Sequence, residues 1–120
     1  MRLKSAMFVA ALLRRANGEG AFAAVVKHGA EEAGAIFVKV ARLDRTADLY
    51  GPAPQAAIDD EAPTDRLFEL IMSVAPEPDV DARLGRERKF DSDAWIVEIE
   101  DRAGRHFLEL VGEARGPGWS

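Results

Sequence analysis

The order of secondary-structure patterns predicts an α+β domain, with one antiparallel sheet of about five strands and two helices packed on one face. Three observations support this fold class. The 120 residues are 48% hydrophobic and 31% charged, which is typical of one globular domain. Helical and strand patterns alternate irregularly along the chain. The links between strands have hairpin length, which favours antiparallel pairing. We expect a single domain over residues 1–111 and a frayed tail over 112–120.

The first element is expected to be a helix that Ser5 caps and that runs to about Ala16. Apolar residues recur at helical spacing from Phe8 onward. The dipeptide Asn17-Gly18 is a typical helix end. Some β character over residues 3–10 leaves a strand at that position as the alternative.

A three-stranded meander follows the first helix. The stretch 21–29 is rich in small and β-branched residues, and a polar turn separates it from the apolar stretch 35–43. A third, short strand ends at Tyr50-Gly51. The short turns predict that these three strands are sequential neighbours in the sheet.

The second half begins with a flexible acidic loop and returns to regular structure. Residues 52–65 hold three prolines and four acidic residues, so little of this segment can be buried. A strand is expected over 66–74, with a short helix as the alternative, and then a helix over 75–90 that Pro78 or Asp79 opens. The last predicted strand spans 94–101, and after a turn residues 106–111 are a further strand candidate.

Composition excludes several classes of function and location. The chain has no cysteine, which excludes disulfides, thiolate zinc sites and cysteine nucleophiles and is compatible with a reducing cytoplasm. The apolar run from Ala6 to Leu13 is too short to span a bilayer. Arg14-Arg15 stand where a signal peptide would need small residues, so we expect a mature cytoplasmic N-terminus and no membrane partner.

The net charge of −5 is unevenly distributed. Residues 1–58 carry 8 Lys/Arg against 5 Asp/Glu, whereas residues 59–120 carry 8 against 16. The acidic balance argues against nucleic acid as a default partner, because phosphate binding needs a basic face. Such a distribution can mark an interaction surface or self-association, but two ordinary solvated surfaces are the simpler explanation.

Three ordered blocks carry a resemblance to a known family. They are "MRLKS" at the start, "GAFAAVVKHGAEEAGAIFVKVARLD" in the middle and "RERKFDSDAWIVEIEDRAGRHF" near the end. Over most of residues 1–109 the chain resembles a bacterial domain-of-unknown-function family, numbered fourteen ninety-one. The resemblance implies a compact, cytosolic, bacterial single domain. The family has no established activity or catalytic residue, so the resemblance implies no chemistry.

An acidic cluster near the C-terminus is the candidate metal site. On a strand, Glu98 and Glu100 point to one face, and Asp101 and His106 follow at the turn. Carboxylates placed in this way hold divalent cations in hydrolases and nucleases. A metal-dependent hydrolase or nuclease that uses these four residues is therefore the enzymatic alternative.

A structural explanation of the same residues competes with the metal site. Glu98 and Glu100 would line a solvent face and pair with Lys27 or Lys39 of neighbouring strands. Asp101 would begin a turn, and the "DSD" of residues 91–93 would form an Asx-type turn between helix and strand. Trp95 is expected in the core. Alternation of apolar and polar residues predicts all of this without a function.

The last candidate is a basic run on the second helix. Arg83, Arg86, Arg88 and Lys89 could bind phosphate, and hence nucleic acid. The acidic residues around the run neutralise much of its charge, and a solvated helix face with local ion pairs explains it better than phosphate binding.

No nucleotide-binding or nucleophile-elbow motif occurs in the sequence, and no cofactor is predicted. The leading hypothesis is a small cytoplasmic binding or protein-interaction module without catalysis of its own. Its expected partner is a second copy of the chain or another protein.

Overall fold

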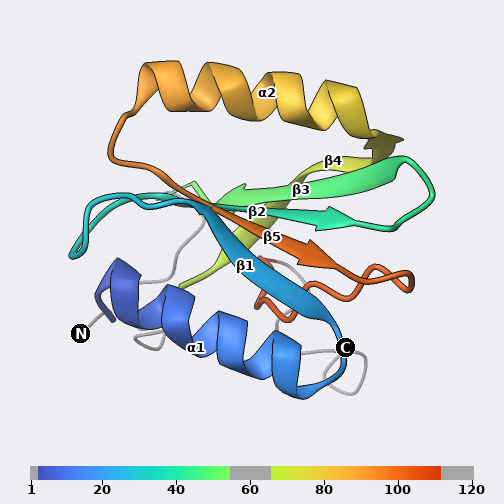
Figure 1. Ribbon diagram of the computed structural model, residues 1–120. Helices are drawn as coiled ribbons and strands as arrows, with labels where there is room; N and C mark the ends of the chain where they lie inside the picture. Colours follow the sequence, from blue (N-terminus) through green and yellow to red (C-terminus); the bar gives the residue numbers. More distant parts are fainter. Residues whose placement is uncertain (1–2, 55–65, 112–120) are drawn as a thin grey trace.

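The computed structural model describes residues 3–54 and 66–111, in which two helices and five strands form one α+β unit (Figure 1). Most of the predicted acidic loop and the whole predicted tail lie outside the described residues. The elements follow the predicted order: α1 (Ser5–Gly18), β1 (Phe22–Lys27), β2 (Ile36–Ala41), β3 (Thr46–Pro52), β4 (Phe68–Pro76), α2 (Glu77–Phe90) and β5 (Trp95–Glu100).

The sheet order is β1-β5-β2-β3-β4, which corrects the prediction that β1 and β2 are neighbours. The strands β2, β3 and β4 do form an antiparallel meander. Between β1 and β2, however, lies β5, antiparallel to β1 and parallel to β2, so the sheet is not purely antiparallel. The reason is burial, because β2 and β5 carry apolar residues on both faces and therefore occupy the interior of the sheet.

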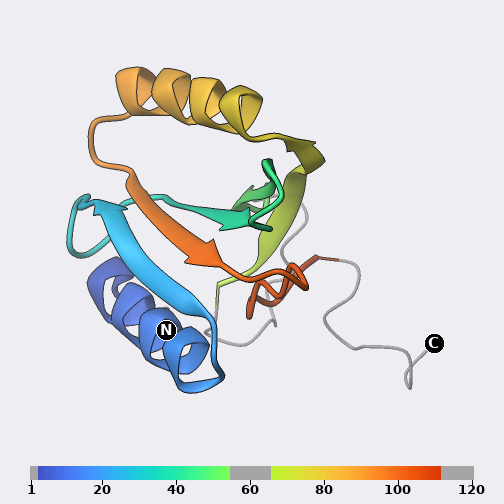
Figure 2. The same ribbon diagram turned by 45° about the vertical axis from the view of Figure 1, so that its right-hand side comes forward.

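The two helices lie on opposite faces of the sheet, so the prediction that both pack on one face is wrong (Figures 1 and 2). Val38 and Val97 point toward α1, while their chain neighbours Phe37 and Ile96 point toward α2. A sheet with two apolar faces needs a cover on each. The helix α2 contacts β3 and β4, so it covers only part of its face, while β1 lies away from it and close to α1 (Figure 2).

At the start of the chain the structure has a helix and not the alternative strand, and the predicted cap at Ser5 is wrong. Residues 5–10 are helical, and the N-cap is Lys4, which makes no side-chain capping bond. Ser5 is fully buried, and its hydroxyl donates to the carbonyl oxygen of Gly34 at 2.6 Å. The guanidinium of Arg66 donates in turn to the Ser5 oxygen at 2.8 Å. A long-range contact thus takes the side chain that local sequence assigned to capping.

The further strand candidate, residues 106–111, is reduced to one bridge. Leu110 pairs with Phe68 at the start of β4, and the backbone of Phe68 bonds to Glu109 and Val111. In the part of the chain that the structure describes, no helix is both long and apolar enough to cross a membrane.

Candidate functional site

A buried lysine joins the sheet to α2. Lys39 lies in the middle of β2 on the α2 side and is 4% exposed. Its Nζ lies 2.7 Å from Glu77 Oε2 and 2.7 Å from Asp81 Oδ1, both on α2, and 3.8 Å from Glu98 Oε1 on β5. A buried cation needs such partners, because an unpaired charge in the interior costs several kcal/mol.

The pKa values of this cluster follow from burial and crowding. Burial by itself lowers the pKa of Lys39, but the hydrogen bonds to Asp81 and Glu77 outweigh it and raise this pKa above its usual value. Burial also raises the pKa of Glu98, against the opposing effect of Lys39 and with a further contribution from Glu100. The lysine therefore stays charged and holds its partners, and it is not poised to act as a nucleophile.

A groove of about 190 Å³ opens between α2 and β1, above β5. The wall that α2 contributes consists of residues three or four positions apart, which lie on one face of the helix: Asp81, Leu84, Gly85 and Arg88. No atom lies within 4 Å of a Cβ added at Gly85, so a docking group can approach the helix backbone there. The other lining residues are Val26, Lys39, Ile96 and Glu98.

The rim of the groove is an exposed apolar strip on β1. Phe22 is 60% exposed and Val26 is 54% exposed, and together with Ala24 they form what we call the β1 strip. Phe22 stands opposite Glu100 and Ala24 opposite Glu98 in the β1–β5 register. The strip thus has acidic neighbours at its Phe22 end and reaches the groove at its Val26 end, where Arg88 lies.

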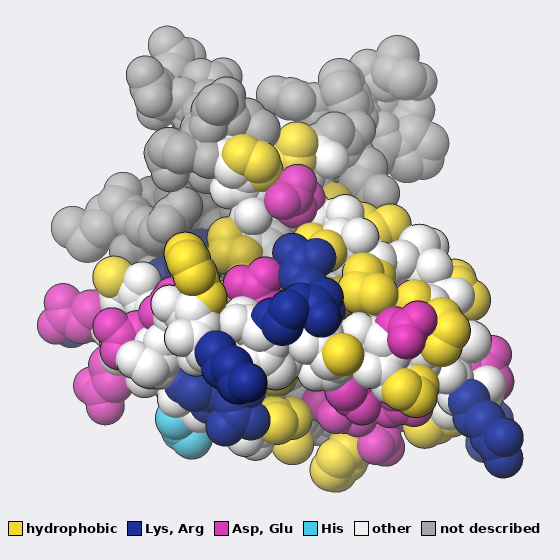
Figure 3. Space-filling view, turned by 90° about the horizontal axis from the view of Figure 1, so that it is seen from above, with side chains coloured by type: hydrophobic (Ala, Val, Ile, Leu, Met, Phe, Trp, Pro, Cys, Tyr) yellow, Lys and Arg dark blue, Asp and Glu magenta, His cyan; other side chains and the backbone are white. Residues whose placement is uncertain are grey.

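The predicted basic residues of α2 do not form one patch. Arg83 is paired with Glu87 at 2.9 Å, whereas Arg88 lines the groove on the opposite flank. Positions five apart on a helix differ by about 140° around its axis, which explains the separation. Arg86 and Lys89 are exposed. Seen from the α2 side, basic and acidic side chains interleave (Figure 3), so α2 presents no continuous cationic face for nucleic acid.

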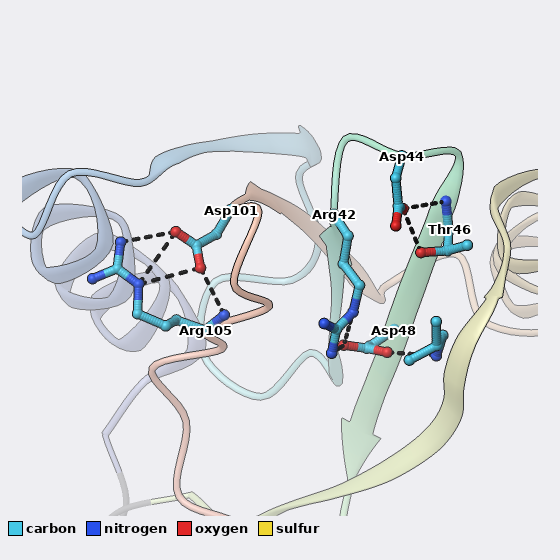
Figure 4. A network of polar contacts seen from close by, with 7 residues as sticks. Arg42, Asp44, Thr46, Asp48, Asp101 and Arg105 are labelled. Carbon is cyan, nitrogen blue, oxygen red and sulfur yellow. Dashed lines mark hydrogen bonds and ion pairs between the residues drawn. The ribbon is translucent and has the colours of Figure 1, made fainter.

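The structure does not bring the four predicted metal ligands together. Glu98 and Glu100 lie on the α2 side of the sheet, as predicted. The ring of His106 instead packs against the ring of Tyr50, with 4.9 Å between their centroids, on the side that α1 covers. Asp101 binds Arg105 at 2.8 Å (Figure 4), and this bonding lowers the pKa of Asp101. Within residues 3–54 and 66–111, no three His, Cys, Asp or Glu side chains are grouped to hold a metal ion.

The structural explanation of the neighbouring residues is confirmed. The backbone N–H of Asp93 donates to Asp91 Oδ1 at 2.9 Å, which is the predicted Asx-type turn. Trp95 is buried, and its Nε1 donates to the carbonyl oxygen of Ala30 at 2.8 Å. Asp101 begins a turn, because its carbonyl oxygen accepts from the N–H of Gly104.

A second polar network, which the sequence did not suggest, joins the end of β2 to β3 and β4 (Figure 4). Asp48 is buried and accepts two hydrogen bonds from Arg42, at 2.7 and 3.1 Å, and one from the N–H of Val74, at 2.6 Å. A Cβ on Gly104 would lie 2.5 Å from Arg42 Cζ, so only glycine lets the guanidinium lie against that turn. This network holds strands and turns together.

The sequence held one signal for the lysine cluster. Lys39 interrupts the otherwise apolar strand "IFVKVA", and its pairing with Glu98 follows from the strand pattern. The two stronger partners, Glu77 and Asp81, lie about 40 residues away on α2, and only the tertiary packing brings them to Lys39.

Comparison with known families decides the classification. Residues 3–109 match the family described as "Protein of unknown function (DUF1491)". The chain belongs to the DUF1491 family. A comparison with curated proteins gives no match.

Solved structures of relatives have the same fold. The solution structure of protein Atu0922 from A. tumefaciens is similar, with 50% identity and a TM-score of 0.79 over 94% of this chain and 98% of that one. The crystal structure of a DUF1491 family protein from Caulobacter crescentus CB15 has 43% identity and a TM-score of 0.74, over 90% and 94% of the two chains. An NMR structure of a DUF1491 family protein from the same organism gives the same values. The family description assigns no activity.

Proposed function

We propose that this DUF1491 protein is a non-catalytic interaction module of the cytoplasm whose partner is a second copy of the same chain. The observation that carries the proposal is the exposed apolar β1 strip, with Glu100 beside its Phe22 end and Arg88 near its Val26 end. Exposed apolar side chains aligned on one strand beside a groove are typical of interaction sites. The lack of cysteine is compatible with the reducing compartment that we propose.

The charges select the arrangement of the two copies. Glu100 stands beside Phe22 at one end of the strip, and Arg88 lies near Val26 at the other. A two-fold axis across the middle of the strip sets Glu100 of each copy against Arg88 of the other, and lays α2 of each copy along the partner's strip. A surface of this kind is self-complementary, as a closed two-fold dimer requires.

The edges of the sheet favour docking through the face over pairing of strands. At the β1 edge, the Asn17 side chain accepts from the N–H of Ala23 at 2.9 Å and donates to its carbonyl oxygen at 3.1 Å. At the β4 edge, the backbone N–H and carbonyl oxygen of Phe68 are already bonded to Glu109 and Val111. Both contacts satisfy groups that a further strand would need.

Exchange of the charges tests the pairing. We expect Glu100→Arg alone and Arg88→Glu alone each to weaken the dimer about five- to tenfold, because each change creates two like-charge contacts in a two-fold dimer. The double variant restores the original affinity, since the opposite charges meet again. Sedimentation velocity over a concentration series measures the dissociation constant.

The apolar strip provides the second arm of the same experiment. Phe22→Ser is expected to weaken the dimer at least about tenfold, because it removes the largest side chain of the strip. Val111→Ser, at an exposed apolar position away from the strip, is the matched control and leaves the constant unchanged. A chain that stays monomeric at millimolar concentration, or a double charge variant no better than the single ones, contradicts the proposal.

A further inference from the structure

A larger cavity lies on the opposite side of the sheet, next to α1. It has a volume of about 370 Å³, within the range of small-molecule sites in proteins. One wall is α1, from Phe8 to Arg15, and the other is the segment 107–110 that follows β5. Arg66, just before β4, closes one end.

Apolar side chains line part of each wall, beside the charged side chains. Phe8 and Leu12 of α1 face Phe107 and Leu110 across the cavity. The ring of Phe8 is itself packed against the buried Phe68, with 5.5 Å between ring centroids, so this wall is part of the core. Such a lining suits the hydrocarbon body of a ligand.

Two guanidinium groups border this apolar space. Arg15 Nη1 donates to the carbonyl oxygen of Phe107 at 3.0 Å, which orients the group across the cavity mouth. Arg66 is 9% exposed, and its Nη2 is held by Ser5 Oγ at 2.8 Å and by the carbonyl oxygen of Leu3 at 3.1 Å. A guanidinium carries several N–H donors in a planar fork that matches a carboxylate.

The wall opposite α1 is held in a strained conformation. Phe107 has a φ of 61°, in the left-handed region that aromatic residues rarely adopt. Its carbonyl oxygen is the acceptor for Arg15, and its ring lies 5.2 Å from the guanidinium carbon of Arg105. Strain of this kind persists only where the surrounding structure holds it, and it concentrates at ligand sites. Here it shapes the cavity and aims one of its two cations.

We infer that this cavity binds a small organic monocarboxylate with an apolar body, with the hydrocarbon against Phe8 and Leu12 and the carboxylate at Arg15. Glu109 also lines the cavity, so the wall carries two positive charges against one negative charge. This balance favours one anionic group over a dianion or a cation. The inference is independent of the dimer, because it uses the other face of the sheet.

Octanoate is the probe, and 1-octanol is its uncharged counterpart with the same hydrocarbon chain. Titration of the full-length protein by two-dimensional ¹H–¹⁵N NMR is expected to shift the amides of α1 and of 107–110. Arg15→Gln should weaken the binding of octanoate about fivefold or more, because a charge-assisted hydrogen bond is lost. The affinity for 1-octanol should change by less than about twofold. Glu109→Gln should strengthen octanoate.

The chain offers matched controls for both parts of the site. Arg14 is exposed on the same helix and does not line the cavity, so Arg14→Gln leaves octanoate binding unchanged. Ala11 lines the cavity at an exposed helix position, so Ala11→Trp should fill it and abolish binding of both probes. Ala10→Trp, on the neighbouring exposed position, should not. Dispersed amide spectra verify that each variant is folded.

Four outcomes overturn the inference. Octanoate at millimolar concentration could leave the amide signals of α1 and 107–110 unshifted. Arg14→Gln and Arg15→Gln could weaken octanoate binding equally. Octanoate could still bind to the Ala11→Trp variant. Equal losses of octanoate and 1-octanol in Arg15→Gln would also overturn it, because they would assign the arginine a structural role only.

Discussion

The residue Glu98 carries a conflict between burial and charge. It lies near Lys39, but it shares the groove with Asp81 and the strand face with Glu100. Burial raises the pKa of Glu98 above the usual 4.5, and the ion pair with Lys39 offsets this only in part. The folded state therefore prefers the protonated carboxyl more than the unfolded state does.

The sign of the pH dependence follows directly. The stability that protonated Glu98 contributes is present below pH 4.5 and is lost as the pH rises through the raised pKa of the folded state. We therefore expect Glu98→Gln to increase the free energy of unfolding near pH 7, by less than about 1 kcal/mol. The gain should vanish near pH 4. Urea unfolding at the two pH values measures it.

The control for this prediction is Glu32→Gln, at an exposed carboxylate whose only ion pair, within the described residues, is a weak contact with Lys4 at 3.9 Å. It should change the free energy of unfolding little at either pH, because exposed pairs contribute little. A Glu98→Gln protein less stable than the wild type near pH 7 would mean that the contact with Lys39 outweighs burial.

At this same scale, sequence reasoning predicts which face a side chain occupies but not what covers that face. The period of two places Glu98 and Glu100 together, and the turn propensity of aspartate explains Asp91 and Asp101. His106 follows a turn and a strained residue lies next to it, so its direction depends on backbone angles that residue type does not reveal.

Among the elements, β4 contains the strongest departure from regular geometry. Its pairing with β3 passes from Ala47↔Ala75 to Leu49↔Met72, which leaves an extra residue in β4. Val74 sits there with a φ of 45°, and the buried Asp48 holds its N–H at 2.6 Å. A bulge of this kind bends an edge strand and hinders the addition of further strands.

We expect Val74→Gly to stabilise the protein by about 0.5–1.5 kcal/mol. Removing the left-handed strain at a β-branched residue should raise the free energy of unfolding by about 1–3 kcal/mol. The greater entropy of glycine in the unfolded chain should lower it again by about 0.5–1 kcal/mol. Val74 is 52% exposed, so little apolar burial is lost. Chemical denaturation of the two proteins measures the difference.

Ser73→Gly is the matched control for this change. Its position is next in the chain and also exposed, but its φ is not in the left-handed region. It should destabilise the protein by up to about 1 kcal/mol, because only the entropy of glycine acts there. Opposite signs for the two glycine variants are the expected result, and a destabilised Val74→Gly would show that the bulge is not strained.

The elements also show where sequence reasoning ends for the fold. Every predicted helix and core strand is present within the described residues, because local periodicity and turn residues determine them. The position of β5 between β1 and β2 depends on competition among strands for the sheet interior, and the apolar side chains on both faces of β2 and β5 decide it. The same fact places the helices on opposite faces.

The whole molecule is thus a three-layer unit with two separate candidate surfaces. α1 covers its face and leaves the 370 Å³ cavity beside it, while α2 covers part of the other face and leaves the β1 strip. In the proposed dimer, a second copy binds the folded chain but not the unfolded one. Dimer formation therefore stabilises the folded state, and more so at higher protein concentration. The thermal midpoint should rise by several degrees when the protein concentration rises about hundredfold across the dissociation constant, as calorimetry measures it.

The separation of the two surfaces sharpens this last prediction. Phe22→Ser should move the dependence of the midpoint to concentrations at least about tenfold higher, because its dimer is weaker by that factor. Saturating octanoate should raise the midpoint of wild type and Phe22→Ser by the same amount at every concentration, since it binds across the sheet from the strip. A change in the concentration slope on adding octanoate would contradict the independence of the two faces, and parallel curves would establish that each face acts on its own.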